Sequence, residues 1–178
     1  INLDAGMIKG GTIGSRIWLD LNGNGIFSDN EPGISEVMVE LFTETGNFVA
    51  STKTGVLGGN SFVGSYKFEN VRPGNYYVKF VISNDYLLSN ANLGNEETDS
   101  DITNTFGRGT TEVFSILSGQ QILYVDGGAY LPACIGDLVW DDVNKNGNQD
   151  EGEPGIAGVK VSLFLSNGQL VDSIRTDG

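Results

Sequence analysis

The sequence contains no histidine and a single cysteine, Cys134, among its 178 residues. Without histidine, the chain cannot build a His-dependent catalytic triad or an imidazole metal site. One cysteine permits neither an internal disulfide nor a thiolate zinc site. We expect Cys134 to be a small buried residue at a domain junction, with a bond to a cysteine outside this chain as the alternative.

Positive charge is also scarce. The chain has 10 Lys and Arg residues against 23 Asp and Glu, a net charge of −13, which disfavours nucleic acid and anionic lipid as partners. No stretch approaches the roughly 18 apolar residues of a membrane-spanning helix, and the first residues do not resemble a signal peptide. We therefore expect an excerpt of a mature protein. Glycine is abundant, with 26 residues, and together with 10% aromatics it favours turn-rich β structure.

Two twelve-residue segments, 20–31 and 142–153, share one pattern of oxygen-bearing side chains. Each has such side chains at positions 1, 3, 5 and 9, a glycine at position 6 and a glutamate at position 12, which is the ligand order of an EF-hand calcium loop. Pro32 and Pro154 follow at once, where an EF-hand would begin a helix, so the pattern predicts calcium loops framed by strands. The candidate ligands are Asp20, Asn22, Asn24, Ser28 and Glu31 in the first loop, and Asp142, Asn144, Asn146, Asp150 and Glu153 in the second.

The resemblance between the two segments extends along the chain at a constant offset of 135 − 13 = 122 residues. It covers the residues before and after the loops and places residues 3–6 on residues 125–128. A period of this length is domain-sized, so we expect tandem domains. The offset predicts the final strand of a preceding repeat at 1–8, a complete calcium-binding β-sandwich repeat at 9–130, and a linker with the first strands of a following repeat at 131–178.

Alternation and β-branched or aromatic residues predict seven strands within the whole repeat, and seven short antiparallel strands predict a two-sheet sandwich. We expect Val37, Val39 and Leu41 on one sheet and Phe68, Tyr76, Val78 and Phe80 on the opposing one. Residues 54–62 and 83–110 show no strand pattern and are expected to be loops. The predicted strands are 13–19, 37–43, 47–53, 64–69, 75–82, 111–117 and 121–126.

The longer of these loops contains an acidic segment, residues 94–101. It places Glu96, Glu97, Asp99 and Asp101 within six residues. A solvated acidic loop is one interpretation. The other is a second cation site, completed by Asp126 from the last predicted strand. We expect Asp99 and Asp101 as ligands, with Asp126 and the two glutamates as secondary candidates.

These motifs together resemble the B domains of the staphylococcal serine-aspartate repeat surface proteins. The resemblance rests on the Ile-Gly-Asp-x-Val-Trp-x-Asp-x-Asn-x-Asn-Gly pattern at 135–147, the tyrosine-rich strands at 66–80, Asp99-Ser100-Asp101 and Val125-Asp126-Gly127-Gly128. It implies all-β, tandem immunoglobulin-like sandwiches of the collagen-adhesin B type with bound calcium. It also implies that the Ile26 carbonyl and Asn148 complete the two loops. Some relatives carry a Lys–Asn isopeptide, but the first strand here has Arg16 and no lysine, so we expect none.

The resemblance implies a non-enzymatic role outside the cell, on the bacterial surface. We expect a calcium-stabilised structural repeat that acts as a rigid stalk or spacer, with neighbouring repeats and other copies in a fibre as its partners. One alternative is an adhesin module that contacts a protein or glycan through loops 54–62 and 83–110. Another is an accessory module of a secreted hydrolase. It ranks last, because this sequence offers no pair of carboxylates for acid–base catalysis outside the calcium clusters.

Overall fold

The structure is a computed structural model, and it describes residues 6–58 and 62–177. Residues 1–5, where we expected most of a preceding repeat's final strand, lie outside the described residues. The chain divides into two compact units, Ile1–Pro132 and Ala133–Gly178. We call them the upstream and downstream units and describe each by itself.

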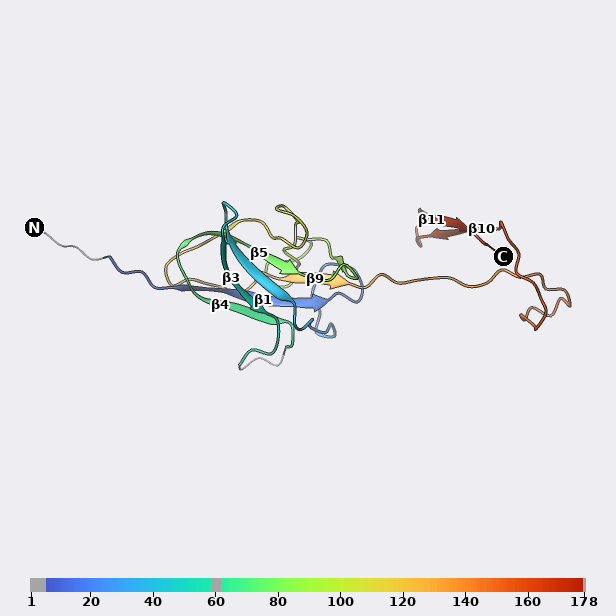
Figure 1. Cartoon of the computed structure of the whole chain (residues 1–178), viewed down its shortest axis with the longest axis horizontal. Coiled ribbons are helices and arrows are strands. Elements are labelled where there is room, and N and C mark those ends of the chain that lie inside the picture. The colour runs from blue at the N-terminus through green and yellow to red at the C-terminus, as the bar shows by residue number, and fades with distance from the viewer. Residues whose placement is uncertain (1–5, 59–61, 178) are drawn as a thin grey trace, which may run out of the picture. The chain divides into compact units, whose positions relative to one another are not determined.

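The upstream unit is a sandwich of two sheets, and Figure 1 shows β3 of one sheet crossing in front of β1 and β4 of the other. No helix occurs in the described residues, so the predicted all-β sandwich is confirmed. The first sheet has the order β4 (Ser65–Val71), β1 (Gly11–Leu19), β9 (Gly127–Tyr130) and β6 (Leu87–Leu88), and β8 (Gln121–Ile122) also pairs with β1. The second has the order β3 (Phe48–Lys53), β2 (Met38–Thr43), β5 (Gly74–Val81) and β7 (Phe114–Ile116).

The core lies between these sheets, and the two-residue period of the strands determines which side chains fill it. Val39 and Leu41 of β2 and Ile13 and Ile17 of β1 are completely buried. One expectation was wrong: Tyr76, Val78 and Phe80 do not oppose β2, because β5 is its antiparallel neighbour in the same sheet. Phe68 does lie on the opposing sheet, in β4.

Strand β1 is the element that positions the candidate site. It pairs antiparallel with β4 and parallel with both β8 and β9, so it is held on both sides. Ile17, Trp18 and Leu19 face Gly127, Gly128 and Ala129 of β9. The strand ends at Leu19, directly before Asp20.

Three further expectations need correction. Of the predicted strand 121–126, only β8 at Gln121–Ile122 is a strand, and the next strand, β9, begins beyond it at Gly127. The connection 83–110 is not structureless, since it contains β6 and isolated bridges at Ala91, Asp99, Ser100, Ile102 and Thr110. Cys134 is exposed rather than buried.

The downstream unit contains the hairpin β10 (Lys160–Phe164) and β11 (Leu170–Arg175). With the offset of 122, these strands correspond to β2 and β3. The local geometry is the same in both hairpins. The register shifts between Leu163 and Phe164 as it does between Leu41 and Phe42. The turn glycines Gly46 and Gly168 have φ of 82° and 86°, which a side chain would disfavour.

Candidate metal sites

The upstream loop, residues 20–31, leaves the end of β1 and returns to the same place. Trp18 forms a β-bridge with Gly33, and the Leu19 amide donates to the Pro32 carbonyl at 2.8 Å. These two contacts bring the first and last residues of the loop together. The Asp20 amide donates to the Ala129 carbonyl at 2.8 Å, which anchors the loop to β9.

Asp20, at the first position, is 1% exposed. Its Oδ1 accepts from the amides of Gly23 at 2.8 Å and Asn24 at 3.2 Å. Its Oδ2 accepts from the Gly25 amide at 2.8 Å and from the Ser89 hydroxyl at 2.6 Å. The loop thus wraps its backbone around one buried carboxylate.

Glu31, at the last position, is 2% exposed and closes the loop. Its Oε1 accepts from the Leu21 amide at 3.0 Å, and its Oε2 accepts from the Ser28 amide at 2.9 Å. Gly25 has φ of 73°, and a Cβ there would collide with the Asn90 carbonyl, so the sixth position requires glycine. Both carboxylates are therefore held inside a loop whose shape depends on that glycine.

The amide and hydroxyl side chains of the loop lie nearer the surface. The side-chain oxygens of Asn22 and Asn24 accept from the amides of Asn24 and Ile26, at 3.0 and 2.8 Å. The Ser28 hydroxyl donates to the Asn30 side chain at 2.7 Å. All the predicted side chains of this loop thus offer oxygen atoms.

The acidic segment, residues 94–101, lies against the upstream loop. Ile26 forms a β-bridge with Asp99, and the Phe27 amide donates to the Thr98 carbonyl at 2.7 Å. The Ser100 amide donates to the Gly25 carbonyl at 3.1 Å. Two segments that are about seventy residues apart in the sequence are thus joined through their backbones.

Asp101 and Asp126 are joined by hydrogen bonds at the inner end of this segment, and Asp99 is near enough to interact electrostatically with both. Asp99 is 5% exposed and Asp126 is 1% exposed. The Asp126 amide donates to Asp101 Oδ2 at 2.6 Å, and the Asp101 amide donates to the Asp126 carbonyl at 2.9 Å. Glu96 is exposed and interacts electrostatically with Asp101. Glu97 is also exposed, and among the described residues its side chain makes no ion pair.

Asp126 is an unusual buried carboxylate. The Ser15 hydroxyl and the Arg16 backbone amide lie beside it, but neither makes a hydrogen bond of good geometry to its oxygens, and the Arg16 Nε lies 3.5 Å from Oδ1. Burial raises the pKa of Asp126 to about 7, although Ser15 and Arg16 act to lower it. Burial likewise raises the pKa of Asp101 to about 7, with the charges of Asp126, Asp99 and Glu96 adding to the shift. A second positive charge at this place would stabilise both ionised forms.

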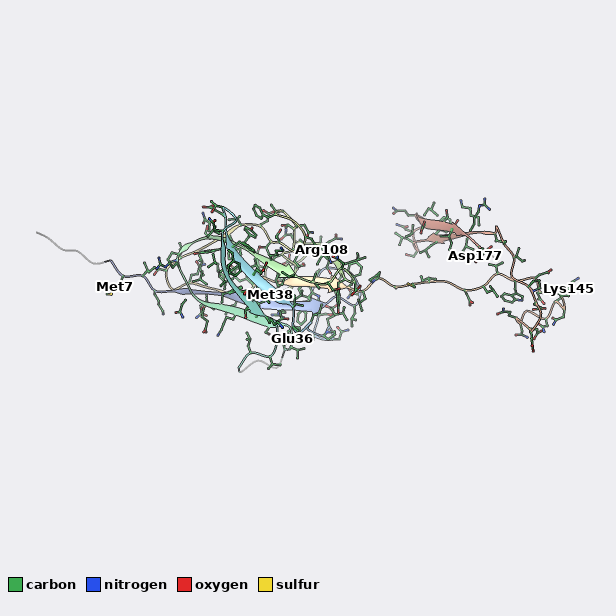
Figure 2. The ribbon with its side chains drawn as sticks, viewed as in Figure 1. Met7, Glu36, Met38, Arg108, Lys145 and Asp177 are labelled. Carbon is green, nitrogen blue, oxygen red and sulfur yellow. The ribbon has the colours of Figure 1, made fainter. Side chains whose placement is uncertain are left out.

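The downstream loop, residues 142–153, repeats the hydrogen bonds of the upstream one. Asp142 accepts from the amides of Asn146 at 3.1 Å and Gly147 at 2.9 Å, and Glu153 Oε2 accepts from the Asp150 amide at 3.1 Å. The backbone amide of Asn148 donates to the side-chain oxygen of Asn146 at 2.7 Å. Figure 2 labels Lys145 in this loop, where it takes a φ of 61° that matches the 70° of Gly23.

Asp150 occupies the ninth position, where the upstream loop has Ser28. Its Oδ2 accepts from the side-chain amides of Asn144 at 2.6 Å and Asn146 at 2.7 Å. These hydrogen bonds lower the pKa of Asp150. Three ligand candidates of the downstream loop thus already converge on one another.

Within residues 6–58 and 62–177, no three acidic side chains gather closely enough to hold a metal by carboxylates alone. Each candidate site therefore combines carboxylates with amide, hydroxyl or carbonyl oxygens. The sequence did not predict two contacts of the candidate ligands: Ser89 with Asp20, and Arg16 with Asp126. Ser89 is distant from Asp20 in the sequence, and no local motif signals either contact.

Exposed aromatic side chains bear on the alternative of a loop-based adhesin. In the described parts of loops 54–62 and 83–110, Phe106 is the strongly exposed aromatic residue, at 47%. Its ring stacks on Tyr77 of β5, with centroids 4.5 Å apart. The described parts of the two loops therefore do not form a cluster of exposed rings.

Comparison with known proteins identifies the family of this architecture. The SdrD B-like domain family matches residues 11–129 and 133–178, which is nearly the whole chain. The chain belongs to this family. SdrD B-like domains are thus present in both units, and the earlier resemblance is confirmed.

Curated relatives of this SdrD B-like chain are serine-aspartate repeat-containing proteins. Protein F of Staphylococcus epidermidis is 36% identical over 179 residues, covering 98% of this chain and 10% of its own length. Protein E of Staphylococcus aureus strain Mu50 is 34% identical over 181 residues, covering 99% of this chain and 15% of its own length. The chain thus spans a small fraction of these relatives. Their family places it in a bacterial cell-surface protein.

Solved structures show a weaker similarity. The Bacillus anthracis TIE protein aligns with a TM-score of 0.41 and 17% identity over 94% of this chain and 24% of its own. The minor pilin GBS52 of Streptococcus agalactiae aligns with a TM-score of 0.40 and 14% identity, covering 74% of this chain and 50% of its own. In the described residues, no helix is long and apolar enough to cross a membrane.

Proposed function

We propose that this chain is a calcium-stabilised structural repeat of an extracellular bacterial surface protein, acting as a rigid stalk or spacer rather than as an enzyme. The observation that carries the proposal is the burial of Asp20 and Glu31 at the two ends of a loop whose remaining polar side chains offer oxygen. Calcium is a hard cation that takes about six to eight oxygen ligands in flexible geometry. The donor set fits this preference.

In the upstream loop, calcium would be held by two carboxylates and four weaker oxygen donors. Its charge would offset the cost of keeping Asp20 and Glu31 out of water. The ligands proposed for this loop are Asp20, Asn22, Asn24, the Ile26 carbonyl, Ser28 and Glu31. Those proposed for the downstream loop are Asp142, Asn144, Asn146, Asn148, Asp150 and Glu153.

A further calcium ion is proposed at Asp99, Asp101 and Asp126, where other oxygen donors would have to complete the ligand set, because the three carboxylates alone do not gather closely enough. The support is Asp126, which is 1% exposed and whose neighbours Ser15 and Arg16 make no hydrogen bond of good geometry to its oxygens. A buried carboxylate with poorly placed donors is costly, and a divalent cation offsets that cost. Because the acidic segment is bonded to the upstream loop, calcium at either place would stabilise the other.

The stalk role follows from this coupling. Without calcium, crowded carboxylates repel each other and loosen the loops; with calcium, they become cross-links between β1, β9 and the acidic segment. Millimolar calcium outside the cell suits the dissociation constants of roughly 10⁻⁴ to 10⁻³ M that extracellular modules show. Neighbouring repeats and other copies in a fibre are the proposed partners.

The first test is thermal unfolding of the 178-residue chain in millimolar calcium and in excess chelator. Calcium at one to ten times its dissociation constant adds about 0.4 to 1.4 kcal/mol per site, so the sites together should raise the midpoint by several degrees. Superimposable curves would contradict calcium binding. Magnesium at the same concentration is the control, because it dehydrates reluctantly and demands octahedral geometry.

The second test addresses stiffness. Small-angle X-ray scattering of a two-repeat fragment in calcium should give an extended particle, and chelation should broaden its distance distribution. The short linker at 131–134 is the physical reason for this expectation. A compact or widely flexing pair in calcium would remove the mechanical basis of the stalk while leaving calcium binding intact.

A further inference from the structure

A groove lies on the side of the upstream unit where the two sheets end. Strand β3 is the last strand of one sheet and β4 is the last strand of the other. Between them is a groove of about 500 Å³, whose lining includes the core side chains Leu41, Ala50 and Phe68. Lys67 and Arg72 also line it.

From Ala50 to Lys53, the β3 edge has few of the features that normally block strand addition, although its register with β2 shifts next to Phe48. Edge strands usually carry several charges, a proline or a bulge that turns them away. In β3, the sequence Phe-Val-Ala-Ser-Thr-Lys has its one charge at the end. Phe48 and Val49 are 59% and 43% exposed. A bridge between Gly55 and Ser65 closes one end of the groove, and beyond it β3 and β4 belong to separate sheets.

The charge of the groove is opposite to that of the molecule. The chain carries −13, yet the charged residues lining the groove are Lys67, Arg72 and Glu69. Glu69 is already paired with Lys67 at 2.7 Å. The exposed guanidinium of Arg72 has no hydrogen-bond or ion-pair partner in the described part of the chain. Arginine in this situation suits a two-point contact with a carboxylate.

We propose that the β3–β4 groove binds an extended acidic peptide segment of a partner protein. The peptide backbone pairs with the free edge of β3, alternate apolar side chains face the floor of the groove, and an Asp or Glu of the peptide binds Arg72. The groove is separate from the calcium sites: Val71 of β4 pairs with Gly11, at the end of β1 away from Asp20. The proposal therefore stands whether or not the repeat binds calcium.

The test uses the full chain and a fluorescein-labelled hexapeptide of alternating valine and aspartate with blocked ends, followed by fluorescence anisotropy. Saturable binding is expected. Arg72→Glu should weaken it roughly tenfold, as expected for loss of a charge-assisted pair and addition of a repulsive charge. Lys79→Glu, on β5 outside the groove, is the matched control and should change it less than about twofold.

Backbone pairing is tested on the unchanged protein. A peptide with alternate N-methylated amides keeps its charge but loses its donors, so it should not bind. In hydrogen exchange, the unmodified peptide should slow exchange of amides in residues 49–53 and leave those of the downstream hairpin unaffected. These measurements do not depend on whether any variant folds.

Four results would overturn the proposal. The first is no binding at millimolar peptide, and the second is equal binding of a valine–lysine peptide. The third is equal binding of the N-methylated peptide. The fourth is a concentration-dependent dimer, seen by sedimentation without peptide and abolished by Val49→Lys, because the occupant would then be a second copy of this chain.

Discussion

Replacing Asp126 by asparagine should change stability in opposite directions with and without calcium. Asp126 is 1% exposed, and its pKa in the fold is about 7 instead of 3.8. A shift of about three units corresponds to roughly 4 kcal/mol of unfavourable free energy once the carboxyl is ionised. Asparagine removes that cost, although its buried amide also needs partners, at about 1 to 2 kcal/mol. A net gain of about 2 kcal/mol is expected in metal-free protein at pH 8.

The sign of the pH dependence follows from the same shift. Because the folded-state pKa values of Asp101 and Asp126 lie above the ordinary 3.8, the folded protein binds more protons than the unfolded chain between about pH 4 and 7. Metal-free protein should therefore be most stable at the acid end of this window and lose stability as the pH rises through 7. Asp126→Asn should make this loss of stability with rising pH smaller.

In millimolar calcium the substitution removes a proposed ligand, so the variant should unfold at a lower temperature than the parent. Urea unfolding at pH 5 and 8, each with calcium and with chelator, measures all four free energies. Asp85→Asn, on an exposed loop, is the control. If Asp126→Asn destabilises the metal-free protein at pH 8 as much as the calcium-loaded one, both the burial argument and the ligand assignment are wrong.

Two further predictions concern the upstream loop. Glu31→Gln should weaken calcium binding more than Ser28→Ala, since it removes a buried charge at the closing position; isothermal titration compares them, and a reversed order would contradict the assignment. Ser89→Ala removes the 2.6 Å hydrogen bond to Asp20 and should cost roughly 1.5 to 3 kcal/mol of unfolding free energy. An unchanged midpoint for Ser89→Ala in both calcium and chelator would mean that this contact does not support the loop.

The sequence was sufficient to predict the all-β fold and the glycine turn at the sixth position of each loop, because both depend on local patterns. The glycine at the sixth loop position and the proline after the glutamate act within a few residues. The sheet membership of Val78 and Phe80 was mispredicted, because alternation shows which residues face inward but not which strand lies beside which. The long connection was mispredicted for a similar reason: its bridges are single residue pairs, such as Asp99 with Ile26 and Thr110 with Lys79, and they leave no periodic signal.

The site was predictable only in part, and the distance along the chain explains the difference. Asp20 and Glu31 lie within one motif, whereas Ser89 reaches Asp20 across 69 residues. In the sequence, Arg16 is notable only as a position without the isopeptide lysine, yet its guanidinium lies 3.5 Å from Asp126 and 4.6 Å from the centre of the Phe27 ring. Such contacts depend on how β1 packs beside β9, which no single segment specifies.

The parallel pairing of β1 with β9 determines how this domain responds to tension. These are the first and last strands of the upstream unit, and Figure 1 shows them pointing the same way. Tension applied before Gly11 and after Tyr130 would pull the two strands past each other along their length. Their hydrogen bonds would then be loaded in shear and break together, instead of opening one at a time from an end. Forced unfolding depends on the unfolding rate, so this arrangement slows rupture without requiring a larger equilibrium stability.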